Sequence, residues 1–206
     1  MLNEAWSSDL DWGTMIWLLM TTGSRRGEVC GLRWQQLDLE SGVVTFRRST
    51  GQIGGSLWEK DTKTHQDRRV TLDSEIVQVL REHRARCEER AAMLRTAVRR
   101  DGYVFSPSTD GSTPTKPDTV TQRYGRLAAR LGLRTHLHCL RHYSATELIA
   151  AGVDVRTVAG RLGHAGGGST TLRTYTAFVQ EADQRAAAAL AARRVRPNGR
   201  SAPVID

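Results

Sequence analysis

The segment that decides the fold is HCLRHYSATELIAAGVDVRTVAGRLGHAGGGSTTLRTY, residues 138–175. Apolar residues at helical spacing predict one helix from His138 to Ala151. They predict a second helix that begins after the N-cap Asp154 and ends at Gly163. Gly166–Gly168 predicts a flexible joint before a further, polar helix. Four groups that can bind or transfer a phosphoryl group lie within this one segment: His138, Arg141, His164 and Tyr175.

The sequence upstream predicts helices around a small antiparallel sheet. Helical spacing of apolar residues predicts a first helix from Asp11 to about Thr22, ended by Gly23, and Ser24 as N-cap predicts a short second helix. Three strand-like runs and two further helices follow, at 43–48, 57–59, 68–72, 73–99 and 118–131. Gly51, Gly54 and Gly55 are expected to separate the first two strands.

Composition and charge narrow the class of protein. The chain has 206 residues, which fits one domain or one domain with a small appendage. No apolar run reaches membrane-spanning length and no signal peptide is visible, so we expect a cytoplasmic protein without a membrane partner. Its three cysteines lack CxxC spacing, which argues against a disulfide framework and a zinc site. The net charge of +8 favours an anionic partner, nucleic acid first.

Each candidate site residue also has an ordinary structural interpretation. His138 and Arg141 project from one helical face and can hold a phosphate, yet the HxxR pattern alone is weak. His164 is placed to cap a helix C-terminus. Spacing alone would put Tyr175 in the core, although a phenol with a pKa of about 10 can serve as a nucleophile once deprotonated.

The region before the sheet offers further phosphate ligands. Arg25 or Arg26 can bring a second guanidinium, which Glu28 can orient through a charge-assisted hydrogen bond. Lys63 lies in or beside the turn before the third strand and can reach a leaving oxygen, with an exposed turn lysine as the alternative. On the helix at 118–131, three arginines share one face, either solvated or facing DNA: Arg123, Arg126 and Arg130.

Five motifs in order resemble one family. TGSRRGEVCGLRW (22–34), the hairpin lysine before a basic strand, HCLRH (138–142), RLGH (161–164) and TTLRTY (170–175) resemble the catalytic domain of the tyrosine recombinases, the phage integrase family. The resemblance covers roughly residues 10–190. It implies the fold of the DNA breaking-rejoining enzymes: an α+β domain, mainly helical, with a small three-stranded antiparallel sheet.

The resemblance also implies roles for individual residues. Arg25 and Arg141 would clamp the scissile phosphate, and Glu28 would support them. His138 and His164 would bind the phosphate and help to move a proton, Lys63 would be the general acid, and Tyr175 the nucleophile that forms a 3′-phosphotyrosine. No metal, ATP or other cofactor is needed. Lys60 is an alternative to Lys63 and Arg26 a weaker one to Arg25, and Lys60, Arg26, Arg123 and Arg126 are candidate DNA contacts.

The expected function is that of a bacterial, nucleoid-associated site-specific recombinase acting on double-stranded DNA. We expect the catalytic domain in residues 1–195, a disordered tail at 196–206, and no N-terminal core-binding or arm-binding domain. We expect a homotetramer in the synaptic complex and a monomer as an isolated domain. Two alternatives stand beside this function: a type IB topoisomerase-like enzyme that relaxes DNA, and a non-catalytic DNA-binding module.

Overall fold

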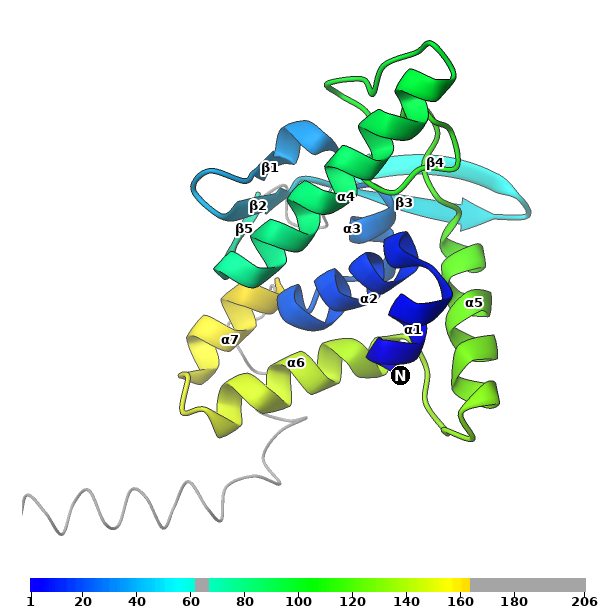
Figure 1. Ribbon diagram of the computed structural model, residues 1–206. Coiled ribbons are helices and arrows are strands. Elements are labelled where there is room, and N and C mark those ends of the chain that lie inside the picture. Colours follow the sequence, from blue (N-terminus) through cyan, green and yellow to red (C-terminus); the bar gives the residue numbers. More distant parts are fainter. Residues whose placement is uncertain (62–66, 164–206) are drawn as a thin grey trace, which may run out of the picture.

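A computed structural model of the protein describes residues 1–61 and 67–163 and confirms the α+β class (Figure 1). Its helices are α1 Leu2–Ser8, α2 Leu10–Thr22, α3 Arg26–Cys30, the 3-10 turn η1 Trp34–Gln36, α4 Ser74–Met93, α5 Pro117–Arg130, α6 His138–Ala150 and α7 Val155–Leu162. Its strands are β1 Leu37–Asp38, β2 Val43–Phe46, β3 Arg48–Ile53, β4 Ser56–Asp61 and β5 Arg68–Thr71. No helix among these residues is long and apolar enough to cross a membrane.

The strands form two separate antiparallel sheets. A three-stranded sheet has the order β1-β2-β5, whereas β3 and β4 form a hairpin of their own. The predicted strand at 57–59 therefore pairs outside the sheet that holds the other two. Gly51 lies within β3 rather than in a turn, where it pairs with Trp58 of β4, and the ring of Trp58 leaves no room for a Cβ there. The turn is made by Gly54 and Gly55, both with positive φ.

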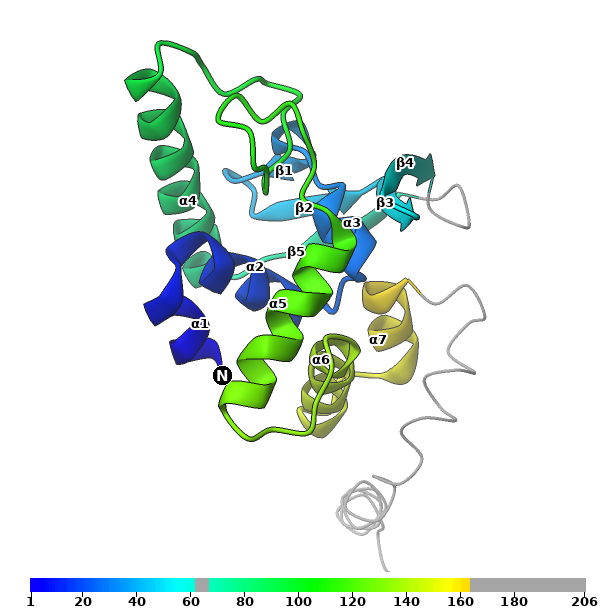
Figure 2. The same ribbon diagram turned by 90° about the vertical axis from the view of Figure 1, so that its right-hand side faces the viewer.

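Helix α2 lies at the centre of the fold, packed against α1, α4 and α6 (Figures 1 and 2). Its residues contribute to one large apolar core with the three-stranded sheet, α4 and α5. A second, smaller core joins α6 to α7 through Ala145, Val158 and Leu162. The position of α6 and α7 relative to the rest of the domain therefore depends on contacts between the two cores.

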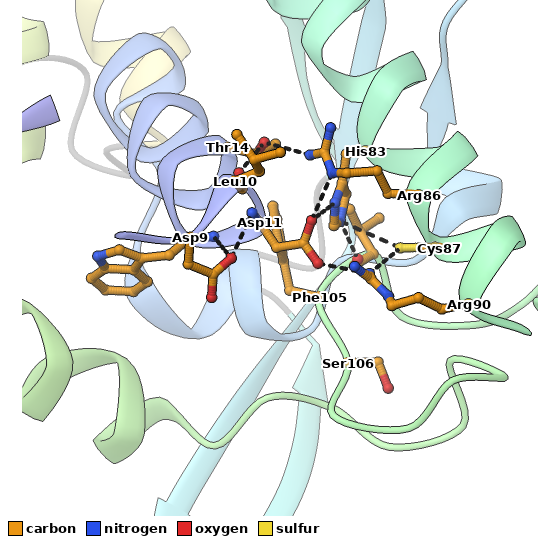
Figure 3. A network of polar contacts seen from close by, with 12 residues as sticks. Asp9, Leu10, Asp11, Thr14, His83, Arg86, Cys87, Arg90, Phe105 and Ser106 are labelled. Atoms are coloured by element: carbon orange, nitrogen blue, oxygen red, sulfur yellow. Dashed lines mark hydrogen bonds and ion pairs between the residues drawn. The ribbon is translucent and has the colours of Figure 1, made fainter. Parts of the chain in front are cut away.

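A polar cluster joins the start of α2 to α4 inside the fold (Figure 3). The carboxylate of Asp11 contacts His83 Nδ1 at 2.9 Å, Arg86 Nε at 3.1 Å and Arg90 Nη2 at 2.7 Å. The second ring nitrogen of His83 lies 2.8 Å from the carbonyl oxygen of Val104. Both ring nitrogens thus face acceptors, so the imidazole carries two protons and a positive charge.

Several predicted helix boundaries are confirmed and others are wrong. Asp154 caps α7, Gly163 ends it in the left-handed conformation, and Asp73 caps α4. Helix α4 ends at Met93 instead of reaching Arg99. Helix α1 was not predicted at all, because its burial depends on the contact of Trp6 with Gly13 and Trp17.

The predicted N-cap of the short second helix is also wrong. The N-cap of α3 is Arg25 rather than Ser24. Ser24 is buried, and its hydroxyl oxygen accepts a hydrogen bond from that of Thr22. The carboxylate of Glu28 takes the capping role instead by accepting the backbone N–H of Arg25.

Candidate active site

Glu28 is buried beneath Arg25 and fixes its guanidinium. Glu28 Oε1 accepts a hydrogen bond of 2.9 Å from Arg25 Nη1, and Oε2 accepts one of 2.8 Å from the backbone N–H of the same arginine. Glu28 is almost inaccessible, whereas 49% of the Arg25 side chain is exposed. The pair therefore presents a held cation to solvent, as a phosphate ligand requires.

Arg26 points away from this pair. Its Nη1 contacts Thr121 Oγ1 at 2.5 Å and Asp118 Oδ1 at 3.4 Å, both on α5. The geometry therefore agrees with the preference of the sequence analysis for Arg25 over the weaker alternative Arg26.

Arg141, on α6, reaches the same place from the other side of the fold. Its Nη1 donates a hydrogen bond of 2.5 Å to the carbonyl oxygen of Gly23, two residues before Arg25. Gly23 has a φ of 58°, and a Cβ there would stand 2.3 Å from Leu162 Cδ2 and 3.1 Å from Ser144 Oγ. The turn Gly23–Arg25 is thus where α2, α3, α6 and α7 meet and where two guanidiniums converge.

His138 is the first residue of α6 and lies beside these arginines. Desolvation and the positive charges of His142, Arg141, His136 and Arg25 lower its pKa below the ordinary value. The ring of His142 stands edge-on to it at 4.8 Å. Near neutral pH, His138 is therefore a neutral imidazole, which can accept a proton or donate a hydrogen bond to a phosphate oxygen.

Three predicted site residues, Lys63, His164 and Tyr175, lie outside the described residues. Lys60 is exposed on β4, opposite Ser49, whose hydroxyl packs against Gly27 of α3. The carbonyl oxygen of Gly163, directly before His164, accepts a hydrogen bond of 3.1 Å from Arg25 Nη2. The end of α7 is thus tied to the first arginine.

The arginines of α5 have different surroundings. Arg123 makes an ion pair of 2.8 Å with Asp9, and its guanidinium lies over the ring of Trp12. Arg130 makes an ion pair of 2.9 Å with Glu4. Both therefore attach α5 to the N-terminal helices, while Arg126 is exposed. Of the two candidate DNA contacts on this helix, Arg126 is the better placed.

Two arginines of the site region were missed by the sequence prediction. Arg68 on β5 donates to Glu28 and to the carbonyl oxygen of Arg161. Arg161 donates in turn to the carbonyl oxygens of Thr21 and Thr71. Arg161 opens the RLGH motif and Arg68 lies in the basic strand after the hairpin lysine, but neither pattern says what these guanidiniums contact.

With this geometry in hand, the comparisons identify the family. The model of the Phage integrase family matches residues 3–181, so the chain belongs to that family. A tyrosine recombinase XerC-like protein of Caldanaerobacter subterraneus subsp. tengcongensis is 30% identical over 173 residues, which are 77% of this chain and 44% of that protein. The tyrosine recombinase XerA of Pyrococcus furiosus is 27% identical over 84% of this chain and 53% of its own. The chain thus spans about half the length of these curated relatives.

Solved structures agree with the fold. A crystal structure of XerA recombinase superposes with a TM-score of 0.65 at 26% identity, covering 89% of this chain and 61% of that one. The XerH site-specific recombinase in its post-cleavage complex with a palindromic difH substrate gives a TM-score of 0.62 at 24% identity, over 90% of this chain and 50% of that one. The latter likeness concerns the fold alone.

Proposed function

We propose that the chain holds the catalytic domain, in residues 1–195, of a site-specific DNA recombinase of the integrase type. It cleaves and rejoins DNA strands through a covalent 3′-phosphotyrosine and needs neither metal nor ATP. The observation that carries this proposal is the convergence of Arg25 and Arg141 on the turn Gly23–Arg25, with Arg25 half exposed above a buried Glu28. Two held cations are what a phosphodiester in an in-line displacement requires when side chains supply the charge.

In the proposed reaction, each residue acts on one phosphodiester. Arg25 and Arg141 bind its non-bridging oxygens and stabilise the charge of the pentavalent transition state. The phenol oxygen of Tyr175 attacks phosphorus and loses its proton, for which the neutral imidazole of His138 provides an acceptor and His164 a second one. Lys63 gives a proton to the departing 5′-oxygen. Attack by a 5′-hydroxyl reverses these steps and rejoins a strand.

The partner of this site is double-stranded DNA, in keeping with the family and with the basic chain. XerH, whose fold is similar, has been crystallised with a difH substrate both before and after cleavage. We extend the proposal to a homotetrameric synapse in the cytoplasm, associated with the nucleoid. On the described surface, Lys60 and Arg126 are the exposed candidates for phosphate contacts, with Arg26 and Arg123 less available.

Covalent trapping tests the proposal without knowledge of the target sequence. The probe is a pool of duplexes with a randomised centre, labelled at the 5′ end of a strand that is nicked just 3′ of the centre. Cleavage beside the nick releases a short fragment, so the labelled strand stays on the protein and migrates with it on a denaturing gel. We expect an adduct with the wild type and none with Tyr175→Phe.

The matched variants separate the alternatives. An adduct that persists in Tyr175→Phe would refute the assignment of the nucleophile, and no adduct from the wild type would favour a module that only binds DNA. Relaxation of supercoiled plasmids regardless of their sequence would indicate a topoisomerase-like activity. Sequencing of the trapped strands gives the preferred site, and Lys60→Ala and Lys63→Ala, compared in parallel, identify the general acid.

A further inference from the structure

Arg68 occupies a buried position between the two parts of the candidate site. It lies on β5, only 7% of its side chain is exposed, and its guanidinium packs over the ring of Phe46 at 4.3 Å. Nη2 donates a hydrogen bond of 2.5 Å to Glu28 Oε2, and Nη1 donates one of 2.6 Å to the carbonyl oxygen of Arg161 on α7. Both terminal nitrogens of this guanidinium are thus bound to protein acceptors rather than directed to solvent.

The contact with Glu28 decides how that carboxylate can act on Arg25. Oε2 of Glu28 receives both the backbone N–H of Arg25 and Nη2 of Arg68, which leaves Oε1 for the guanidinium of Arg25. Three donors on two oxygens fix the plane of the carboxylate. Without Arg68, the buried carboxylate would keep Arg25 as its only arginine partner and could rotate to draw the guanidinium inward, away from a substrate.

The second contact sets the end of α7. Besides the bond to Arg161, the side chain of Arg68 lies directly against Gly163, where an added Cβ would stand 2.8 Å from Cδ and 3.0 Å from Nε. The carbonyl oxygen of the same glycine accepts a hydrogen bond from Arg25 Nη2. Arg25, Arg68 and the last turn of α7 therefore form a closed set of contacts around one buried guanidinium.

We propose that Arg68 is a positioning residue for DNA cleavage: it orients Arg25 through Glu28 and holds the last turn of α7 against it, without touching DNA. This inference rests on the proposed recombinase function and adds to it a residue that acts through Arg25. Loss of a residue that orients a metal ligand typically lowers activity about tenfold to a hundredfold, and we expect a loss of the same order when Arg25 loses its orienting partner. Because both terminal nitrogens of Arg68 are bound to protein acceptors, we expect equilibrium binding of DNA to be unchanged without them.

The test measures the rate of adduct formation under single-turnover conditions with the nicked duplex pool, and equilibrium binding of the same pool. Arg68→Met keeps the length of the stem and removes the donors. Arg69→Met makes the same change at the neighbouring position of β5, which is exposed. We expect adduct formation about tenfold to a hundredfold slower in Arg68→Met, with unchanged binding, and a wild-type rate in Arg69→Met.

A double-mutant cycle shows whether Arg68 acts through Arg25. In an Arg25→Ala background, adding Arg68→Met is expected to change the rate by about twofold or less, since its target is already gone. If Arg68→Met unfolds the chain, Arg68→Lys replaces it. Lys keeps the charge and one hydrogen bond, and its rate is expected between those of the wild type and Arg25→Ala.

Three outcomes overturn the inference while the proposed function stands. These are equal rates for Arg68→Met and Arg69→Met, a full additional loss in the Arg25→Ala background, or a loss of DNA binding that accounts for the loss of rate. If the folded Arg68→Lys variant is used instead, a wild-type rate overturns it as well. Absence of an adduct from the wild type is a different result, because it refutes the recombinase function and this inference together.

Discussion

Arg141 Nη1 donates a 2.5 Å hydrogen bond to the carbonyl oxygen of Gly23, although 118 residues separate them in the chain. This one contact brings the HxxR motif to the turn that carries Arg25. Position 23 is a glycine for a separate reason: its φ is positive, and Leu162 and Ser144 leave no room for a Cβ.

The two adjacent arginines of α3 are expected to differ sharply on substitution. Arg25→Ala removes a held, half-exposed cation and should slow adduct formation about a hundred- to a thousandfold, as does loss of one preorganised donor elsewhere. Arg26→Ala removes a contact with α5 and should leave the rate close to that of the wild type. Single-turnover trapping measures both. The reverse order of effects would place the phosphate ligand at position 26.

Gly163 and Gly152 form a matched pair for a stability measurement. Both have positive φ, but a Cβ at Gly152 meets nothing within 4 Å, whereas at Gly163 it meets Arg68. Gly152→Ala should lower the free energy of unfolding by about 1–2 kcal/mol for the left-handed conformation alone. Gly163→Ala should lose roughly a further 1 kcal/mol or more through crowding. Urea denaturation measures both, and equal losses would show that Arg68 moves aside at no cost.

His83 makes stability depend on pH. Burial alone would lower its pKa, but hydrogen bonds to Asp11 and Cys87 and the charges on both raise it to about 9. A raised pKa in the folded state means that the stabilisation is complete below about pH 6.5 and is lost as the pH rises toward 9. We expect the free energy of unfolding to fall by up to about 3 kcal/mol across this window.

Substitution assigns that pH dependence to His83. His83→Gln should be less stable at pH 6 and should show a much flatter profile, while His136→Gln, at an exposed position, should keep the wild-type profile. The measurement is urea denaturation across the pH range. A decline that persists undiminished in His83→Gln would assign the dependence to another group.

Glu59 attaches the β3–β4 hairpin to the body of the domain. Its Oε1 accepts hydrogen bonds from Arg33 Nη2 at 2.7 Å and from the hydroxyl of Tyr103, and Oε2 accepts one from Arg48. Glu59→Gln replaces a charged acceptor by a neutral one and should speed amide hydrogen exchange in β3 and β4 but not in β2 and β5. Glu88→Gln, in an exposed pair on α4, is the control. Uniformly faster exchange would indicate global destabilisation instead.

Substitutions of Arg126 and Arg123 should distinguish an arginine that contacts DNA from one that forms an ion pair within the protein. Arg126→Gln should weaken binding of duplex DNA and reduce its dependence on salt by about one unit of logarithmic slope. Arg123→Gln breaks the ion pair with Asp9 and should leave that slope unchanged while lowering the thermal midpoint. Binding titrations at several salt concentrations measure the slopes. Equal slopes for Arg126→Gln and the wild type would remove α5 from the interface.

The features that could be predicted are those with local signals. Asp154 and Gly163 bound α7 as predicted because capping and the left-handed stop depend on neighbouring residues. Helix α1 and the separate hairpin were missed because they depend on Trp6 and Trp58, whose rings pack on Gly13 and Gly51.

The candidate site divides in the same way. The motifs of the sequence predict a cluster around Arg25, Glu28, His138 and Arg141, and the structure brings these four together. The resemblance favoured Arg25 over Arg26, but the residue types alone left both open, since the physical difference depends on what α5 offers to Arg26. The sequence could not identify Arg68, because strand periodicity tells which face a residue occupies but not which distant carboxylate or carbonyl it meets.

The arginines that join the site are bound mostly to main-chain oxygens, and this has a consequence for which substitutions the chain tolerates. Arg141 and Arg161 donate to the carbonyl groups of Gly23, Thr21 and Thr71. Every amino acid supplies the same carbonyl, so Thr71, whose side chain is exposed, can be exchanged freely while its bond persists. A saturation mutagenesis screen should therefore find that the arginine donors do not tolerate substitution, whereas acceptors such as Thr71 do. These contacts then constrain the identity of the donor residue but not that of the acceptor residue.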